Sequence, residues 1–381
     1  MKFPWSQWLR LVALSTPIHT IIMLALMISP LWASESIVLV KPHKGNTFFD
    51  TDAGYDTFSK GGFSEQFITS DLTFNITYDD VGVGFNDPNT GVAVRNRLKD
   101  VLAYVADQIN YPGRTLDIQV TVSETDGTGA LASAGTFYPN SAGFHTGSTL
   151  QRLKTGLKPF FGFPEISVTV DVGFAWNVPA GTPQPGEADF FTVLLHEITH
   201  GLGFTSLIEP DGSSSIGPGI YTVFDSFLTD GPDGPRLLSD GNIPEFQLDV
   251  ANLVGNDVWF AGPQARLRDA DAPVPVYSPG PYEPGSSLSH WDINRLQSSS
   301  AITHVVFLGS TQRTYSGIDL GALIDIGYTR IEGAPSALPA GCTPAATTGE
   351  KTQSAGAGLI LLIVAMLFLS ASRWWRVAVV C

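Results

Sequence analysis

The pentad His196-Glu197-Ile198-Thr199-His200 restricts this chain more than any other feature of its sequence. In an α-helix, two side chains four residues apart point about 40° from each other and lie about 6 Å apart along the axis. Both imidazoles can therefore reach one tetrahedral metal ion, with the Glu197 carboxylate beside it. The pattern predicts a helix that carries a metal centre.

The flanking residues favour a helix through this pentad. Apolar side chains recur at the spacing of a single helix face, at Phe191, Leu194, Leu195, Ile198 and Leu202. Asp189 is a suitable N-cap, and Gly201 and Gly203 mark the C-terminal end. The alternative is a structural helix whose histidines bond only to backbone groups. With seven histidines in 381 residues, a chance pentad is rare, so metal binding is preferred.

The third metal ligand is the open question. Catalytic zinc sites use three protein ligands and keep one position for water. In the compact pattern HExxHxxGxxH, the third histidine would stand at position 206, which is Ser206 here. Either the site is incomplete or the ligand comes from further along the chain. The other histidines after the first 33 residues are His43, His145, His290 and His304.

Two segments resemble the leishmanolysin-like branch of the metzincin zinc metallopeptidases. The first is His196–Phe204, with the sequence HEITHGLGF, and the second is Ser289–Asp292, with the sequence SHWD. A looser similarity extends to the ending Ser316–Tyr328. In that branch, a long insertion separates the helix from a Ser-His-Trp segment that carries the third zinc ligand.

The resemblance implies a metal site, a chemistry and a fold. The implied zinc ligands are His196, His200 and His290, and Glu197 is the implied general base. His304 is the alternative third ligand. The implied fold is a two-lobed α+β zinc peptidase, with an N-terminal mixed sheet, helices that include the active-site helix, and an irregular C-terminal lobe.

The chain lacks one residue that is typical of metzincins, a methionine in a tight turn under the metal. Its four methionines all lie in the terminal segments, at Met1, Met23, Met27 and Met366. Ser300–Thr303 occupies the expected region, where Ile302 offers an apolar floor. Because that methionine does not bind the metal, its loss does not exclude the chemistry. Some relatives are held latent by a cysteine, but no cysteine precedes the helix here.

The periodicity of the body predicts an α+β order with helices against one sheet. Strands are expected at Leu72–Tyr78, Leu116–Val122 and Ile166–Phe174, and helices at Val92–Ile109, Leu150–Leu157 and Leu320–Ile326. We expect the strand Ile166–Phe174 to form the edge of a cleft and to hold an extended peptide. Tyr315 is a candidate to stabilise an oxyanion.

The two ends of the chain predict export and a membrane segment. Residues 1–33 have a positive start, an apolar core and a small residue at Ala33, as in a signal peptide, with an uncleaved anchor as the alternative. Residues 333–354 are typical of a flexible stalk. The apolar segment 355–372 is near the minimum for a membrane span, and residues 373–381 form a basic cytoplasmic tail.

Between these ends we expect an N-terminal lobe with the zinc-binding helix, residues 34–204, and a C-terminal lobe with the third ligand, residues 205–332. The ends resemble the sorting signals of bacterial surface proteins, in which the tail is either retained or processed. The two cysteines, Cys342 and Cys381, lie outside both lobes, so we expect no disulfide in the body.

Charge restricts the partners. A net charge of −15 argues against nucleic acid, which is bound by basic patches. The Asp-rich stretches 225–240 and 269–271 are weak candidates for structural calcium, because neither has the spacing of an EF-hand.

The sequence therefore predicts an exported, monomeric zinc endopeptidase, periplasmic, secreted or attached to the cell surface, that hydrolyses proteins or peptides. The alternative is a catalytically decayed surface adhesin on a peptidase scaffold, suggested by Ser206 and the missing methionine. A purely structural zinc site is disfavoured, because such sites are usually closed by cysteine or a fourth histidine.

Overall fold

The computed structural model describes residues 38–40, 63–123, 130–296 and 299–330. The predicted leader, stalk, membrane segment and tail lie outside these ranges, together with His43 and both cysteines. The described residues all belong to one compact unit. Within the described ranges, no helix is long and apolar enough to span a membrane.

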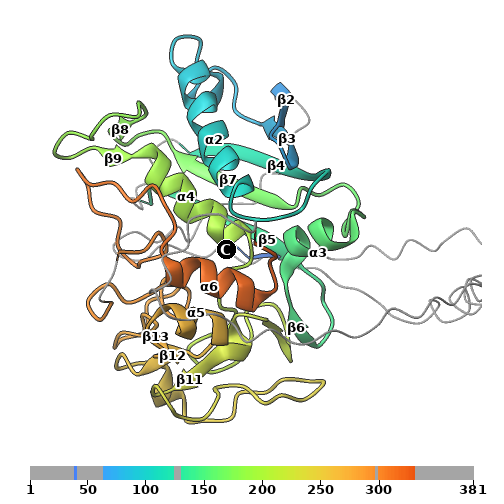
Figure 1. Ribbon diagram of the computed structural model, residues 1–381, viewed down its shortest axis with the longest axis vertical. Coiled ribbons are helices and arrows are strands. Elements are labelled where there is room, and N and C mark those ends of the chain that lie inside the picture. The colour runs from blue at the N-terminus through green and yellow to red at the C-terminus, as the bar shows by residue number, and fades with distance from the viewer. Residues whose placement is uncertain (1–37, 41–62, 124–129, 297–298, 331–381) are drawn as a thin grey trace, which may run out of the picture. The chain divides into compact units, whose positions relative to one another are not determined.

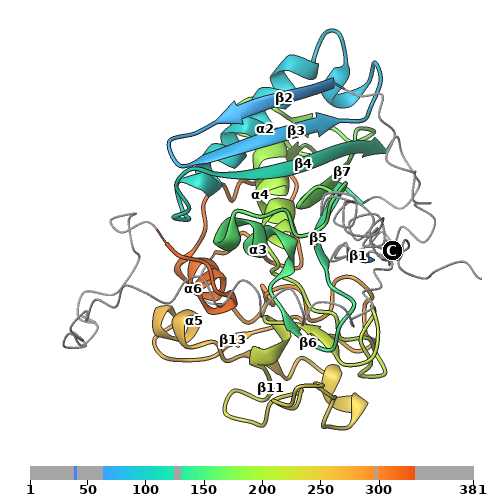
Figure 2. The same ribbon diagram turned by 90° about the vertical axis from the view of Figure 1, so that its right-hand side faces the viewer.

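A six-stranded mixed sheet forms the framework, with the strand order β1-β5-β7-β4-β3-β2 (Figure 2). β3, β4 and β7 are parallel to one another, whereas β2, β5 and β1 pair antiparallel with their neighbours. The strands are β1 (Val38–Val40), β2 (Phe63–Ile68), β3 (Leu72–Tyr78), β4 (Arg114–Ser123), β5 (Ala132–Tyr138) and β7 (Ile166–Asp171).

The two faces of this sheet differ in chemistry, since side chains alternate along each strand. On one face, Ile76, Ile118 and Ile166 stand in register across β3, β4 and β7, and all three are buried. On the other face the register instead aligns Thr77, Gln119 and Ser167. The apolar face is therefore the one that the helices cover.

Three helices pack over the apolar face: α2 (Gly91–Ala106), α3 (Gly147–Thr155) and α4 (Phe190–Gly201) (Figure 1). The approach of α4 is close, because a Cβ atom on Gly201 would lie 2.6 Å from Ile166 Cγ2. Glycine thus lets the end of α4 rest directly on β7. Two short parallel strands lead into α4, β8 (Trp176–Asn177) and β9 (Ala188–Asp189).

After α4 the chain is mostly irregular, with short elements. β10 (Ile220–Thr222) pairs with β6 (Gly143–His145), and β11 (Leu228–Asp230), β12 (Val258–Phe260) and β13 (Val274–Pro275) form a small antiparallel sheet. Helices α5 (Pro263–Arg268) and α6 (Gly317–Ile326) pack against each other. The single-turn 3₁₀ helices are η2 (Gly84–Asn86), η3 (Asp225–Phe227) and η4 (Val250–Leu253).

The α+β fold class is confirmed: the protein combines a mixed sheet with a few helices. β3 has the predicted bounds, and β4, α2, α3 and α6 lie where they were expected with shifted ends. The cleft-edge hypothesis for Ile166–Phe174 is wrong. β7 ends at Asp171 and pairs on both sides, with β4 and β5, so it presents no free edge to a peptide.

Candidate metal centre

The N-terminus of helix α4 is capped by Asp189, which also forms an ion pair with Arg313. The carboxylate of Asp189 accepts hydrogen bonds from the Thr192 amide at 3.0 Å and its hydroxyl at 2.7 Å, as the N-cap prediction required. Arg313 pairs with the same carboxylate. Burial alone would raise the pKa of Asp189, but the bonds from Arg313 and Thr192 lower it. Every residue of α4 is buried, so the helix is fixed at the centre of the molecule.

Three histidines converge at the C-terminal half of this helix. The Nε2 atoms of His196, His200 and His290 lie 3.1 Å from one another in all three pairs. All three side chains are buried, with at most 5% of each residue exposed. His290 thus joins the two helix histidines from a segment 90 residues after His200.

Backbone carbonyls determine the tautomer of each ring. Nδ1 of His196 lies 2.9 Å from the Ala301 carbonyl, Nδ1 of His200 2.7 Å from that of Phe204, and Nδ1 of His290 2.8 Å from that of Ser286. A carbonyl oxygen can only accept, so each Nδ1 carries the proton. All three Nε2 atoms therefore direct lone pairs at one point, which is the arrangement of histidine ligands around a metal ion.

The electrostatics of the cluster favour a cation. Burial lowers the pKa of His200 to about 4. Burial and the two neighbouring imidazoles hold the pKa of His290 well below its usual value. Three neutral rings with converging lone pairs repel one another unless a cation lies between them. Zn–N bonds of about 2.0–2.1 Å in a tetrahedral site set N–N edges of about 3.4 Å, close to the observed 3.1 Å.

One buried carboxylate connects the segment that carries His290 with the segment whose carbonyl orients His196. Asp319 at the start of α6 accepts from the Trp291 indole at 2.9 Å and from the Ala301 amide at 3.0 Å. It also accepts from the Ser300 hydroxyl at 2.5 Å. Ala301 provides the carbonyl that orients His196, and Trp291 follows His290. Asp319 therefore braces the surroundings of both histidines, a role that we did not predict, although its capping box with Ser316 is visible in the sequence.

His304 does not belong to the cluster. Its ring stacks on Tyr277 with centroids 3.7 Å apart, and its Nδ1 lies 3.3 Å from the Trp291 carbonyl. Ser206 also takes another role, because its hydroxyl accepts from the Ile208 amide at 3.1 Å. His145 bonds through Nε2 to the Ser141 carbonyl at 2.7 Å. The group of three is thus His196, His200 and His290.

The remaining candidates lie around this centre. Glu197 is buried on α4 between the two helix histidines. Ile302 is fully buried next to Ala301, in the segment expected to replace the methionine turn. The Tyr315 hydroxyl is bonded to Thr199 Oγ1 at 2.7 Å, so it braces α4, and we do not assign it the oxyanion role.

Elsewhere in the described residues, no further group of three metal-ligating side chains occurs. The Asp-rich stretches therefore do not bring three carboxylates together there. Asp225, for example, accepts from the Thr222 amide at 2.9 Å and the Leu207 amide at 3.1 Å.

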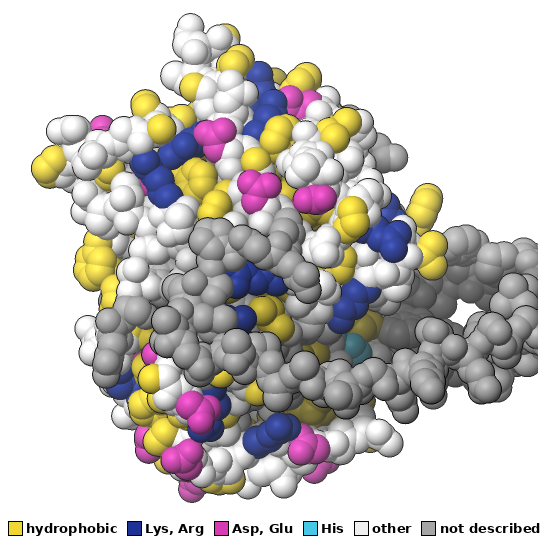
Figure 3. All heavy atoms as spheres, viewed as in Figure 1, with side chains coloured by type: hydrophobic (Ala, Val, Ile, Leu, Met, Phe, Trp, Pro, Cys, Tyr) yellow, Lys and Arg dark blue, Asp and Glu magenta, His cyan; other side chains and the backbone are white. Residues whose placement is uncertain are grey.

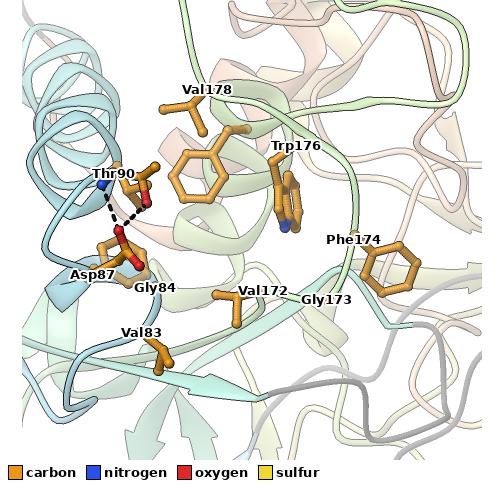
Figure 4. A pocket seen from close by; sticks show the side chains of 12 residues that line it. Val83, Gly84, Asp87, Thr90, Val172, Gly173, Phe174, Trp176 and Val178 are labelled. Atoms are coloured by element: carbon orange, nitrogen blue, oxygen red, sulfur yellow. Dashed lines mark hydrogen bonds between the residues drawn. The ribbon is translucent and has the colours of Figure 1, made fainter.

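A cavity of about 610 Å³ opens near the N-terminus of α4, away from the three histidines. Phe190, Trp176, Phe174 and Val172 line it, and Asp87 bonds to Thr90 at its rim (Figure 4). Its walls are mainly apolar, and none of the three histidines is among the described residues that line it. The cavity and the metal centre are therefore separate features of the molecule.

The fold and site define an α+β protein with a buried three-histidine centre that could hold a metal ion. Comparison with protein-family models, curated proteins and solved structures found no match for this chain.

Proposed function

We propose that this protein is a zinc-dependent endopeptidase with a metzincin-like, two-lobed architecture. The observation that carries the proposal is the convergence of three neutral Nε2 atoms at 3.1 Å, two of them from an HExxH helix. A three-histidine set leaves the fourth tetrahedral position for water, as catalytic zinc sites require. Structural sites are usually closed by four ligands, and this cluster has three.

In this proposal, the three histidines and Glu197 have different roles. His196, His200 and His290 hold the metal, and their Nδ1 bonds to carbonyls fix the ring orientations. Bound zinc supplies Lewis acidity, which lowers the pKa of water and polarises a carbonyl. Glu197 accepts the proton of the attacking water on its carboxylate and passes it to the leaving amine. The substrate class is a protein or peptide chain.

The proposal includes a location outside the cytoplasm. It rests on the leader-like start of residues 1–33 and on the apolar and basic segments after residue 354. We propose that the protein acts as a monomer, periplasmic, secreted or held at the cell surface.

The alternative function is a non-catalytic surface adhesin on a decayed peptidase scaffold. The absence of methionine from the body favours it. Glu197 opposes it, since a binding protein that only needed the metal for stability would not need a buried carboxylate between the two ligands.

The experiment that separates these functions is Glu197→Gln in the full chain. This change keeps the size of the side chain and removes the base, so peptide hydrolysis should fall about 10²–10⁴-fold while bound zinc stays the same. Casein digestion and metal analysis of the same preparations measure both quantities. Exposed Glu245 provides the matched control, and Glu245→Gln should keep full activity. Undiminished hydrolysis in Glu197→Gln would reject the mechanism, and hydrolysis absent from the wild type would favour the adhesin.

A further inference from the structure

The loop after α3, residues 156–163, presents apolar side chains to solvent. Phe161 is 88% exposed and Leu157 is 73% exposed. The neighbouring phenylalanines point inward: Phe160 is buried, and the Phe163 ring lies 5.6 Å from that of Phe137. Two inward anchors therefore hold the loop while Phe161 stands out. We call residues 156–163 the α3 loop.

Basic residues gather around the α3 loop. Between positions 100 and 235, the chain has only four Lys and Arg residues: Arg114, Arg152, Lys154 and Lys158. The fold brings Arg114 to this loop, because a Cβ atom on Gly156 would collide with its guanidinium. Arg152 Nη1 donates to the Gly156 carbonyl at 2.8 Å. Figure 3 shows apolar and basic side chains side by side where α3 and its loop lie.

This concentration of positive charge is unusual in a chain of net charge −15. Lys158 pairs with Asp117, and a carboxylate oxygen of buried Glu165 lies 4.0 Å from Lys158 Nζ. Part of the local positive charge is therefore neutralised. Lys154 is exposed, and its ammonium lies near Gly327 at the end of α6, so Arg114 is the cation that the fold brings to the loop itself. An exposed Phe and Leu with Arg114 close by fit a boundary where apolar chains lie below anionic groups.

We propose that the α3 loop docks on the surface of an anionic lipid bilayer. Phe161 and Leu157 would enter the boundary between headgroups and acyl chains, and the surrounding cations would bind anionic headgroups. An acidic protein surface would satisfy the cations but would leave two strongly exposed apolar side chains without an apolar partner, so a bilayer fits better. This inference is independent of the peptidase proposal.

Hydrogen exchange of the full chain, read by mass spectrometry, tests this inference locally. The terminal apolar segments are expected to tether every variant to vesicles, so total binding is not informative. Instead, amide exchange in residues 156–163 should slow roughly tenfold on vesicles of phosphatidylcholine with phosphatidylglycerol. It should not slow on phosphatidylcholine alone. Salt at about 1 M, where the Debye length is about 3 Å, should weaken the effect.

Three variants sharpen the test. Phe161→Ser removes the apolar tip and Arg114→Gln removes the charge beside Gly156, and both should reduce the protection on anionic vesicles. Val81→Ser is the matched control, because Val81 is 81% exposed but follows Asp79 and Asp80. Near-ultraviolet circular dichroism checks that each variant is folded.

Several outcomes would overturn the proposal. Exchange that is unchanged on anionic vesicles would exclude lipid docking, and equal protection on both vesicle types would exclude recognition of anionic lipid. Protection without vesicles that grows with protein concentration would instead identify a second copy of the chain as the occupant.

Discussion

At the scale of single residues, the decisive contacts are the three Nδ1 bonds to carbonyls, because they leave the lone pair of every Nε2 atom in the cluster available to a metal ion. Substituting a histidine of the cluster should therefore lower the affinity for zinc, whereas substituting a nearby buried histidine outside the cluster should not. His290→Ala should lower zinc affinity about 100-fold or more, beyond the usual effect of losing an outer partner. His304→Ala should keep its zinc, because His304 stacks on Tyr277 outside the cluster.

Metal analysis after dialysis against graded chelator measures both affinities. Zinc loss in His304→Ala together with retention in His290→Ala would move the third ligand to His304. His145→Ala is a further control, because that ring is bonded to the Ser141 carbonyl.

Asp225 predicts a pH dependence of stability. Burial raises the pKa of this carboxyl to about 6, despite bonds from Ser206, Thr222 and Leu207. In the unfolded chain the pKa is about 3.9. The folded state therefore binds the proton more tightly, and this contribution to stability is complete below about pH 4 and is lost as pH rises through about 6. Its size is at most about 3 kcal/mol, from two pKa units.

Asp225→Asn keeps an acceptor for the two backbone amides and removes the buried charge. Its free energy of unfolding, relative to wild type, should rise between pH 4 and 7 and then level off. Urea titrations of the metal-free proteins at several pH values measure this difference without the pH dependence of metal binding. Parallel pH curves for the two proteins would mean that Asp225 does not titrate in this range.

At the scale of elements, α4 depends on its close approach to β7. Gly201→Ala would place a methyl group 2.6 Å from Ile166 Cγ2, so strand or helix must shift. We expect a loss of about 1–3 kcal/mol in stability and a lower melting temperature. Gly181→Ala is the matched control, since no atom lies within 4 Å of the added methyl group. Equal melting temperatures in thermal unfolding would contradict the tight packing.

The sequence predicted those elements whose periodicity is strong and local. α2 buries Leu98, Val101 and Leu102 along one face, and β3 alternates buried and part-exposed residues over its whole length, so both could be recognised. β5 was not predicted, because Ala132–Tyr138 mixes small residues with aromatic ones and is buried at nearly every position, so it shows no alternation. The interior place of β7 could not be predicted either, because strand order depends on distant pairing with β4 and β5.

At the scale of the whole molecule, the core joins segments of the chain that lie before and after α4. Trp291 packs against Phe204 with ring centroids 4.8 Å apart and against Phe260 at 5.4 Å. The Tyr328 hydroxyl donates to the Leu202 carbonyl at 2.8 Å. The pentad and the segment around His290 were recognisable in the sequence, but the Asp319 links were not, because they form only when distant segments meet.

Metal removal should therefore weaken the molecule as a whole. His290 reaches α4 across 90 residues, and a bound ion would connect that segment to the helix in the folded state only. Zinc at about 1,000 times its Kd would stabilise the fold by about 4 kcal/mol, which corresponds to about 6 °C in Tm for a folded body of about 300 residues. Calorimetry with chelator should show this fall in wild type and its restoration by added zinc. The same chelator should barely change the Tm of His290→Ala, since that variant starts without the link. An equal fall in both proteins would mean that the ion does not bind through His290.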